Sequence, residues 1–254
     1  MSSAASVEWP TGTVNGYSYR DIAKAIDHSL LKPELTEQEV EAGLQLAVLY
    51  DVASVCCRPC DVPLASRLLS GSDVRVGSTV GFPHGANTTE TKVVEAVQAM
   101  DSGAAELDMV LNIGQLRSGN IDFVRSDIAA VVEAARGRAL VKVILENAYL
   151  TEDQTVTASK TAAVAGGNFV KTSTGFAPTG AVVSDLILMR ASVPPDVRLK
   201  AAGGIRSLDA MLEVLDVGVT RVGATATQQI LDEFKARAAG LPAPPPPVEA
   251  SDDY

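Results

Sequence analysis

The sequence predicts an α/β protein built as one (β/α)8 barrel, the TIM-barrel fold, and three observations support this. Short apolar runs rich in β-branched residues alternate with longer segments of helical periodicity. Successive runs begin roughly 20 to 35 residues apart, which is the size of a βαβ unit. Eight such units fit one domain of 254 residues. A doubly wound open sheet is the alternative, and it is disfavoured because eight open strands would leave edge strands with polar faces.

The expected strands lie at 29–31, 52–57, 74–82, 105–111, 139–145, 168–173, 197–203 and 220–225. Between them, Thr36 with Glu39 and Thr151 with Gln154 match the capping box that begins a helix. Residues 19–27 are expected to form a short helix before the first strand. Residues 1–20 are interpreted as an N-terminal extension and 21–240 as the barrel. Residues 241–254 contain five of the 13 prolines and end in acidic residues, so they predict a flexible tail.

Composition excludes several classes of protein. Lys and Arg number 21 and Asp and Glu 31, a net charge of −10, which disfavours nucleic-acid binding. The sequence shows neither a signal-peptide pattern nor an apolar run of the roughly 20 residues that span a membrane, so a cytoplasmic protein is expected. Cys56, Cys57 and Cys60 are too few and odd in number for a disulfide framework. With only two histidines beside them, no metal site is expected.

Charged residues lie within the expected strands, although a barrel strand has no solvent face. Strict alternation places Glu106 and Asp108 on the inward side of one strand, and Lys142, Lys171 and Lys200 inward on the next three. Burying an unpaired charge costs several kcal/mol. Such a cluster therefore indicates either a structural ion-pair network or an active site. The active site is favoured because barrel interiors are usually filled by Val, Ile and Leu.

Lys171 and Lys200 belong to neighbouring strands, about 4.8 Å apart. Two unit charges about 4 Å apart repel by roughly 4 kcal/mol at an effective dielectric constant near 20, which would lower the pKa of one ammonium group by about three. One amine would then be neutral near pH 7 and nucleophilic toward carbonyl groups, and Lys171 is the expected one. Lys200, held protonated by Asp108, would transfer protons.

The last three strands end in turns of glycine and small residues at 173–176, 201–206 and 222–226. Backbone amides in such turns can approach an anion closely, and barrels often bind phosphate there. Gly203 and Gly204 precede Ser207, an expected N-cap, and Gly223 precedes a helix expected to begin near Thr225. The turns therefore favour a phosphorylated substrate. The alternative is that these glycines only permit tight turns.

Four motifs in this order, DHSLLKPE at 27–34, ELDMVLNIG at 106–114, KTSTGF at 171–176 and LKAAGGIR at 199–206, resemble the 2-deoxyribose-5-phosphate aldolases. These are class I aldolases of deoxynucleoside catabolism. SVCCRP at 54–59 and VKVILE at 141–146 extend the resemblance to residues 21–230. It implies cleavage of 2-deoxy-D-ribose 5-phosphate to D-glyceraldehyde 3-phosphate and acetaldehyde, without a metal or an organic cofactor.

The resemblance also implies roles for single residues. Lys171 would form the Schiff base, Lys200 would tune it, and Asp108 would join a water-mediated proton relay. Asp27 would contact substrate hydroxyls, while Lys142 would support the charge network. Cys56 matches a thiol near the pocket that reacts with aldehydes. The remaining expected substrate-binding residues are Thr174, Gly175, Gly203, Gly204, Gly223 and Thr225.

The chain departs from the family pattern at three places. Phe176 stands where some members have a lysine, and Thr225 with Ala226 stands where a serine pair is common, so weaker phosphate affinity or wider substrate tolerance is expected. In some members a C-terminal tyrosine enters the active site, whereas Tyr254 follows a different, proline-rich approach. The alternative functions are a transaldolase-like Schiff-base enzyme and a non-catalytic sugar-phosphate-binding barrel. A homodimer is expected only as the commonest oligomer.

Overall fold

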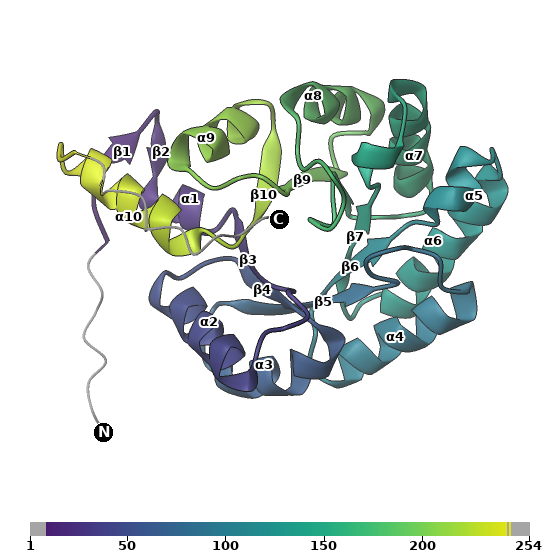
Figure 1. Ribbon diagram of the computed structural model, residues 1–254, viewed down its shortest axis with the longest axis horizontal. Helices are drawn as coiled ribbons and strands as arrows, with labels where there is room; N and C mark the ends of the chain where they lie inside the picture. Colours follow the sequence, from purple (N-terminus) through teal and green to yellow (C-terminus); the bar gives the residue numbers. More distant parts are fainter. Residues whose placement is uncertain (1–8, 243, 245–254) are drawn as a thin grey trace.

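The computed structural model describes residues 9–242 and 244. Within them, eight parallel strands form a closed barrel in which β10 pairs with β3, and helices surround it (Figure 1). The barrel strands are β3 (Ile26–Leu30), β4 (Ser54–Cys57), β5 (Arg75–Val80), β6 (Glu106–Val110), β7 (Leu140–Ile144), β8 (Phe169–Lys171), β9 (Arg198–Ala202) and β10 (Val219–Ala224). The prediction of a TIM barrel is confirmed, and the open sheet is wrong because no barrel strand among the described residues is an edge.

The helices follow the strands in turn. They are α1 (Tyr19–Ala23), α2 (Glu37–Leu49), α3 (Val62–Leu68), α4 (Thr89–Asp101), α5 (Ile113–Arg117), α6 (Ile121–Ala135), α7 (Glu152–Val164), α8 (Val183–Ser192), α9 (Leu208–Asp216) and α10 (Thr227–Ala238), with 3-10 turns at Pro59–Asp61 and Asn147–Tyr149. Thr36 and Thr151 form the expected capping boxes, and Ser207 caps α9. Each cap satisfies amide groups that the first helical turn leaves unpaired.

The strands and helices share one apolar layer between them. Val141 and Val143 point outward from β7, and both are buried. On α6, Val124, Ile128 and Val131 recur at helical spacing and are buried as well. Burying a side chain of this size stabilises the fold by about 1.5–3 kcal/mol. Since this layer supplies much of the stability, the interior of the barrel can hold polar groups.

Most strand boundaries differ from the prediction by one or two residues, and the differences that bear on the site lie at the first barrel strand and the last helix. The first barrel strand begins at Ile26 rather than 29, so Asp27 and His28 lie inside it, and the helix before it ends at Ala23. The inward carboxylate and the imidazole interrupt the apolar run that marks a strand in the sequence. The last helix begins at Thr227, two residues after Thr225, because Ala226 is its N-cap.

The residues before the barrel form a short hairpin, β1 (Thr13–Val14) with β2 (Tyr17–Ser18), which lies beside α10 (Figure 1). Trp9 stacks on buried Tyr19, with ring centroids 4.4 Å apart. This segment therefore packs on the barrel. Most of the predicted tail, including Tyr254, lies outside the described residues, and the division of the chain into extension, barrel and tail stays a prediction.

Candidate active site

The inward side chains of adjacent strands form a buried polar cluster inside the barrel. Asp27 on β3, Asp108 on β6, Lys142 on β7, Lys171 on β8 and Lys200 on β9 all belong to it. The side chain of Lys171 is 3% exposed, and those of the other four are at most 1% exposed. The charges of distant strands therefore meet in one place, as alternation within each strand predicts.

Asp108 joins the two lysines of β8 and β9. Lys171 and Lys200 are paired in register, which places them side by side. The Nζ atoms of Lys171 and Lys200 each lie 2.7 Å from Oδ2 of Asp108. Lys142 Nζ lies 3.2 Å from the other carboxylate oxygen. One carboxylate thus bridges both amines, so their mutual repulsion is partly compensated, which the sequence-based estimate did not include.

A second set of ion pairs lies below this bridge, toward the amino ends of the strands. Asp27 Oδ2 lies 2.8 Å from Lys142 Nζ and 2.6 Å from Lys200 Nζ. Arg221 on β10 donates from Nε to Asp27 over 2.6 Å and contacts Glu106 Oε2 at 2.8 Å. Glu106 also pairs with Lys142 at 2.6 Å. Arg221, which sequence reasoning missed, therefore links the last strand of the closed barrel to the first.

The environment inside the barrel favours the charged form of Asp27 and disfavours the charged form of Lys200. Burial alone would raise the pKa of Asp27, but Lys142, Lys200 and Arg221 outweigh burial and hold that pKa well below its usual range. Burial lowers the pKa of Lys200, although the carboxylates of Asp108 and Asp27 oppose it. Sequence reasoning took Lys200 as the protonated amine of the pair. The expectation of a neutral Lys171 stays a prediction.

Cys56 lies on β4 two residues after Ser54, so both side chains point into the barrel. The Ser54 hydroxyl donates a hydrogen bond to Asp27. Burial and then the charge of Asp108 raise the pKa of the Cys56 thiol to about 11, although the charges of the three neighbouring lysines oppose this rise. The thiol is therefore protonated at neutral pH. Because the thiolate is the nucleophilic form, this environment suppresses reactions of Cys56 with electrophiles.

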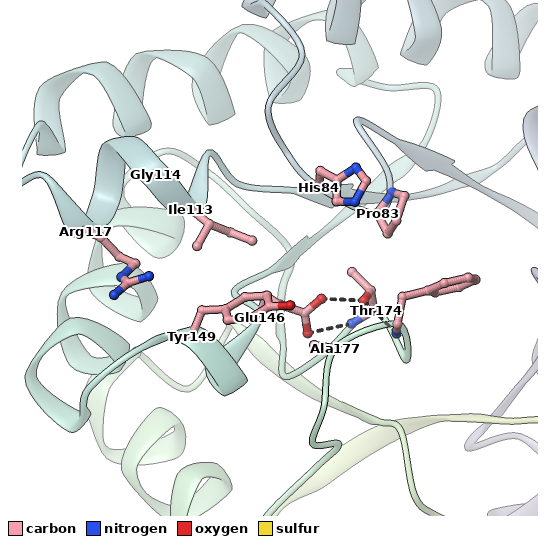
Figure 2. Close-up of a pocket in the computed structure, with 10 residues that line it drawn as sticks. Pro83, His84, Ile113, Gly114, Arg117, Glu146, Tyr149, Thr174 and Ala177 are labelled. Atoms are coloured by element: carbon pink, nitrogen blue, oxygen red, sulfur yellow. Dashed lines mark hydrogen bonds between the residues drawn. The ribbon is translucent and has the colours of Figure 1, made fainter. Parts of the chain in front are cut away.

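Glu146, another residue that sequence reasoning missed, anchors the loop after Lys171. It follows β7 in a left-handed conformation, with φ of 58°, and is buried. Its carboxylate accepts a bond of 3.1 Å from the amide of Thr174 and another from the Thr174 hydroxyl (Figure 2). The same hydroxyl accepts from the amide of Phe176 at 3.0 Å. The Thr174 side chain is thus engaged within its own loop.

A cavity of about 410 Å³ opens beside this loop at the carboxyl ends of the strands (Figure 2). The residues around it include apolar side chains, Glu146 and one arginine. They are Pro83, His84, Ile113, Gly114, Arg117, Glu146, Tyr149, Thr174, Phe176 and Ala177. The charge of Lys171 acts on Glu146, whose pKa burial nevertheless raises. The cavity is therefore lined by the loop that follows Lys171, and it is large enough for a small ligand.

The glycines expected to bind phosphate lie at this same carboxyl end, after β8 and β9 and within β10. Gly175 and Gly204 have positive φ angles of 91° and 81°, and no heavy atom lies within 4 Å of where a Cβ would stand at either. Gly203 is required by packing as well, because its Cβ would lie 2.8 Å from Cα of Gly180. Gly223 is half-buried and Thr225 exposed. Backbone in these turns is open enough for an anion to approach.

Stability is expected to fall as pH drops, and His28 is the first cause. Burial lowers the pKa of His28 to about 4, and its Nδ1 lies 2.9 Å from Oγ1 of Thr227. The unfolded chain binds this proton below about pH 6.5, whereas the folded protein does not, so about 3 kcal/mol is lost between about pH 6.5 and 4. Denaturant titrations across this range measure the loss.

The matched variant is His28→Gln, which should remove most of that pH dependence. Below about pH 4 the unfolded chain protonates Asp27 and Asp108, whose pKa values the surrounding cations lower in the fold against the effect of burial, so a further loss follows. A wild-type stability that is constant from pH 7 to 4 would contradict the assignment of His28.

The fold and the site together define a class of protein: a (β/α)8-barrel enzyme with a cluster of buried lysine amines and carboxylates inside the barrel. The chain belongs to the DeoC/LacD family of aldolases, because that family's sequence profile matches residues 22–240.

Curated relatives and solved structures agree with this assignment. A deoxyribose-phosphate aldolase from Caldanaerobacter subterraneus is 48% identical over 225 residues, covering 88% of this chain and 97% of the relative. One from Streptococcus gordonii is 50% identical over 208 residues, covering 82% and 94%. The tetrameric deoxyribose phosphate aldolase structure from Aeropyrum pernix has a TM-score of 0.80 at 30% identity and covers 87% of this chain and 93% of its own.

Two further findings concern the described residues alone. No helix among them is long and apolar enough to cross a membrane. The three cysteines are free thiols, with Cys56 and Cys57 buried in β4 and Cys60 exposed.

Proposed function

We propose that this aldolase cleaves 2-deoxy-D-ribose 5-phosphate reversibly to D-glyceraldehyde 3-phosphate and acetaldehyde, through a Schiff base on Lys171. The observation that carries the proposal is the position of Lys171. It is the last residue of β8, the loop that follows it lines the cavity, and its amine contacts the carboxylate that also holds Lys200. The relatives that share the fold over most of their length carry the name of this activity.

The charge count of the cluster favours a neutral amine. Four cationic side chains, Lys142, Lys171, Lys200 and Arg221, face three carboxylates. An unpaired charge in a buried site is relieved by losing its proton. One of the three lysines would therefore give up its proton and act as the nucleophile, and we assign this role to Lys171, whose side chain is the most exposed of the three.

The reaction follows from that amine. The Lys171 amine attacks the aldehyde carbon of the open-chain sugar, and loss of water leaves a protonated imine. Removal of the proton from the hydroxyl on carbon three lets the bond between carbons two and three break. Its electron pair flows into the imine and forms an enamine, while D-glyceraldehyde 3-phosphate leaves. Protonation of the enamine carbon and hydrolysis by water then release acetaldehyde and restore the amine.

Asp108 and Lys200 are placed to move these protons. Asp108 contacts both amines, so it can hold a proton released by one while the other carries charge. Because burial lowers the pKa of Lys200, that amine gives up its proton more readily than an exposed lysine does. We assign the relay to this pair with a water molecule between them and the substrate hydroxyl. Asp27 and Lys142 would keep Lys200 and Asp108 in position through their ion pairs.

The substrate phosphate would bind at the open turns that contain Gly175 and Gly204, beside Gly223 near the end of β10. Phe176 packs edge-on against Phe82, with centroids 5.4 Å apart, where some family members have a cation. The expected result is a KM for 2-deoxyribose 5-phosphate within about tenfold of that for 2-deoxyribose, because Phe176 adds no positive charge to the phosphate site. Steady-state kinetics with both sugars measure it, and a preference for the phosphate of several hundredfold would contradict it.

The direct test of the function is product analysis. Purified protein incubated with 2-deoxyribose 5-phosphate should release equal amounts of acetaldehyde and D-glyceraldehyde 3-phosphate. Turnover of a ketose phosphate instead would identify a transaldolase-like enzyme. Binding of both sugars without any turnover would identify a sugar-phosphate-binding barrel, and either result would overturn the proposal.

Assembly and location stay predictions. The Aeropyrum pernix structure is tetrameric, and a homodimer is proposed for this chain as the commonest symmetric oligomer. Light scattering of the purified protein tests the dimer. A cytoplasmic location is likewise proposed.

A further inference from the structure

A second cavity, of about 450 Å³, lies at the amino ends of the barrel strands, opposite the end that carries Lys171. Arg75 is the first residue of β5, Leu140 of β7 and Arg198 of β9, and all three line it. Its charged lining is almost entirely basic. The lining residues are Arg20, Lys24, Ala53, Asp73, Arg75, Leu140, Arg198 and Arg221, which we call the basic mouth.

Three of the five cations of the basic mouth have weak or missing partners. Arg198 lies over the Phe169 ring, 4.0 Å from its centroid, and forms no ion pair within the described part of the chain. Arg20 on α1 is exposed and likewise has no ion pair among residues 9–242. Arg75 has only Glu106 Oε1, at 3.8 Å. Lys24, by contrast, pairs with Asp51 at 2.6 Å.

These guanidinium groups repel one another. The pKa of Arg198 is lowered, first by burial and then by the charge of Arg221, with Arg75 adding to the effect. Arg221 cannot turn away, because Asp27 and Glu106 hold it inside the barrel. Asp73 is the one carboxylate in the lining, and Arg20 and Arg198 have no ion pair within the part of the chain that the structure describes. An added anion would relieve this repulsion.

Guanidinium groups suit one kind of anion particularly well. Each offers a planar fork of N–H donors that matches the oxygens of a phosphoryl group. Arg221 is buried and Arg198 is half-buried, so an anion bound by them would be partly withdrawn from water, where each charge-assisted hydrogen bond is stronger. A volume of about 450 Å³ leaves room for more than one phosphoryl group.

We propose that the basic mouth is a second ligand site, which binds a small phosphate-bearing anion and prefers two linked phosphoryl groups to one. The site is separate from the aldolase centre, since the ion pairs of Arg221, Glu106 and Lys142 fill the barrel between the two ends. It faces solvent through Arg20 and Arg75, so ligand can enter without any change in the barrel.

Isothermal titration with pyrophosphate and with inorganic phosphate, at low ionic strength, tests the proposal. Pyrophosphate is expected to bind the full chain about tenfold more tightly than inorganic phosphate, because it engages more guanidinium groups. The double variant Arg20→Gln with Arg75→Gln should bind pyrophosphate about tenfold more weakly than the wild type. Both side chains lie at the surface, so the variant should fold and keep its aldolase activity.

The matched control is Arg125→Gln with Arg136→Gln, which removes the same charge from exposed positions on and beside α6. Its affinity for pyrophosphate should equal that of the wild type. A third variant, Arg198→Gln, removes the unpaired guanidinium and should weaken binding as well. The absence of pyrophosphate binding to the wild type, or equal binding by the wild type and the Arg20/Arg75 variant, would overturn the proposal.

Discussion

Replacing Lys171 with methionine is expected to lower the rate of 2-deoxyribose 5-phosphate cleavage by at least about 10⁴-fold, because the nucleophile is lost while the cavity stays intact. The same change should not destabilise the protein. It removes the one amine that the three carboxylates do not need as a counter-charge and leaves Lys142, Lys200 and Arg221 paired with them. Steady-state kinetics and denaturant unfolding measure the two effects on one sample.

Lys160→Met is the matched control, since Lys160 is an exposed residue of α7. It should leave both the rate and the stability unchanged. If Lys171→Met retained a tenth of the wild-type rate, the nucleophile would be another group, and Lys200 would be the next to test.

The second large effect is on stability. Asp27→Asn removes the carboxylate that contacts Lys142, Lys200 and Arg221, all of them buried. Breaking a buried ion pair by removing one partner typically costs about 3–5 kcal/mol, because the remaining charge is uncompensated. A loss of that size in the free energy of unfolding is expected at pH 7, measured by guanidinium chloride titration.

Asp122→Asn provides the comparison, because it breaks a pair with Arg125 in which the Asp122 side chain is 90% exposed. An exposed pair contributes at most about 1 kcal/mol. Equal effects of the two substitutions would mean that the buried cluster does not hold the barrel together, and that its charges are retained for catalysis alone.

The sequence predicted most of the fold because every βα unit shows its own local periodicity. It also predicted which charges point inward, since alternation along a strand is a local property. The positions of Asp108, Lys142, Lys171 and Lys200 inside the barrel follow from that alternation together with the barrel itself.

What the sequence could not show depends on contacts between distant strands. Arg221 reaches Asp27 across 194 positions, and only closure of β10 against β3 brings them together. A signal for Arg221 was present, because it precedes Gly223 by two residues in the last strand and so shares its face. Glu146 gave no such signal, since its role depends on a left-handed backbone turn.

The buried charges form a structural ion-pair network and also hold the proposed reactive groups in position, so the two interpretations are compatible. Glu106 and Arg221 pair with each other below the bridge of Asp108, while Lys171 lies above it. The lower ion pairs fix the positions of Lys142 and Asp27, and these in turn hold the groups that react. Positioning of this kind is what a Schiff-base site requires, because its amine must stay buried and close to a proton acceptor.

The central claim is that Lys171 forms the covalent intermediate, and aldehyde trapping tests it most directly. The protein is incubated with acetaldehyde and borohydride, digested and examined by mass spectrometry. One reduced two-carbon adduct on Lys171 is predicted, and it should be absent from the Lys171→Met variant. No adduct, or an adduct on Lys200 that persists in that variant, would contradict the claim.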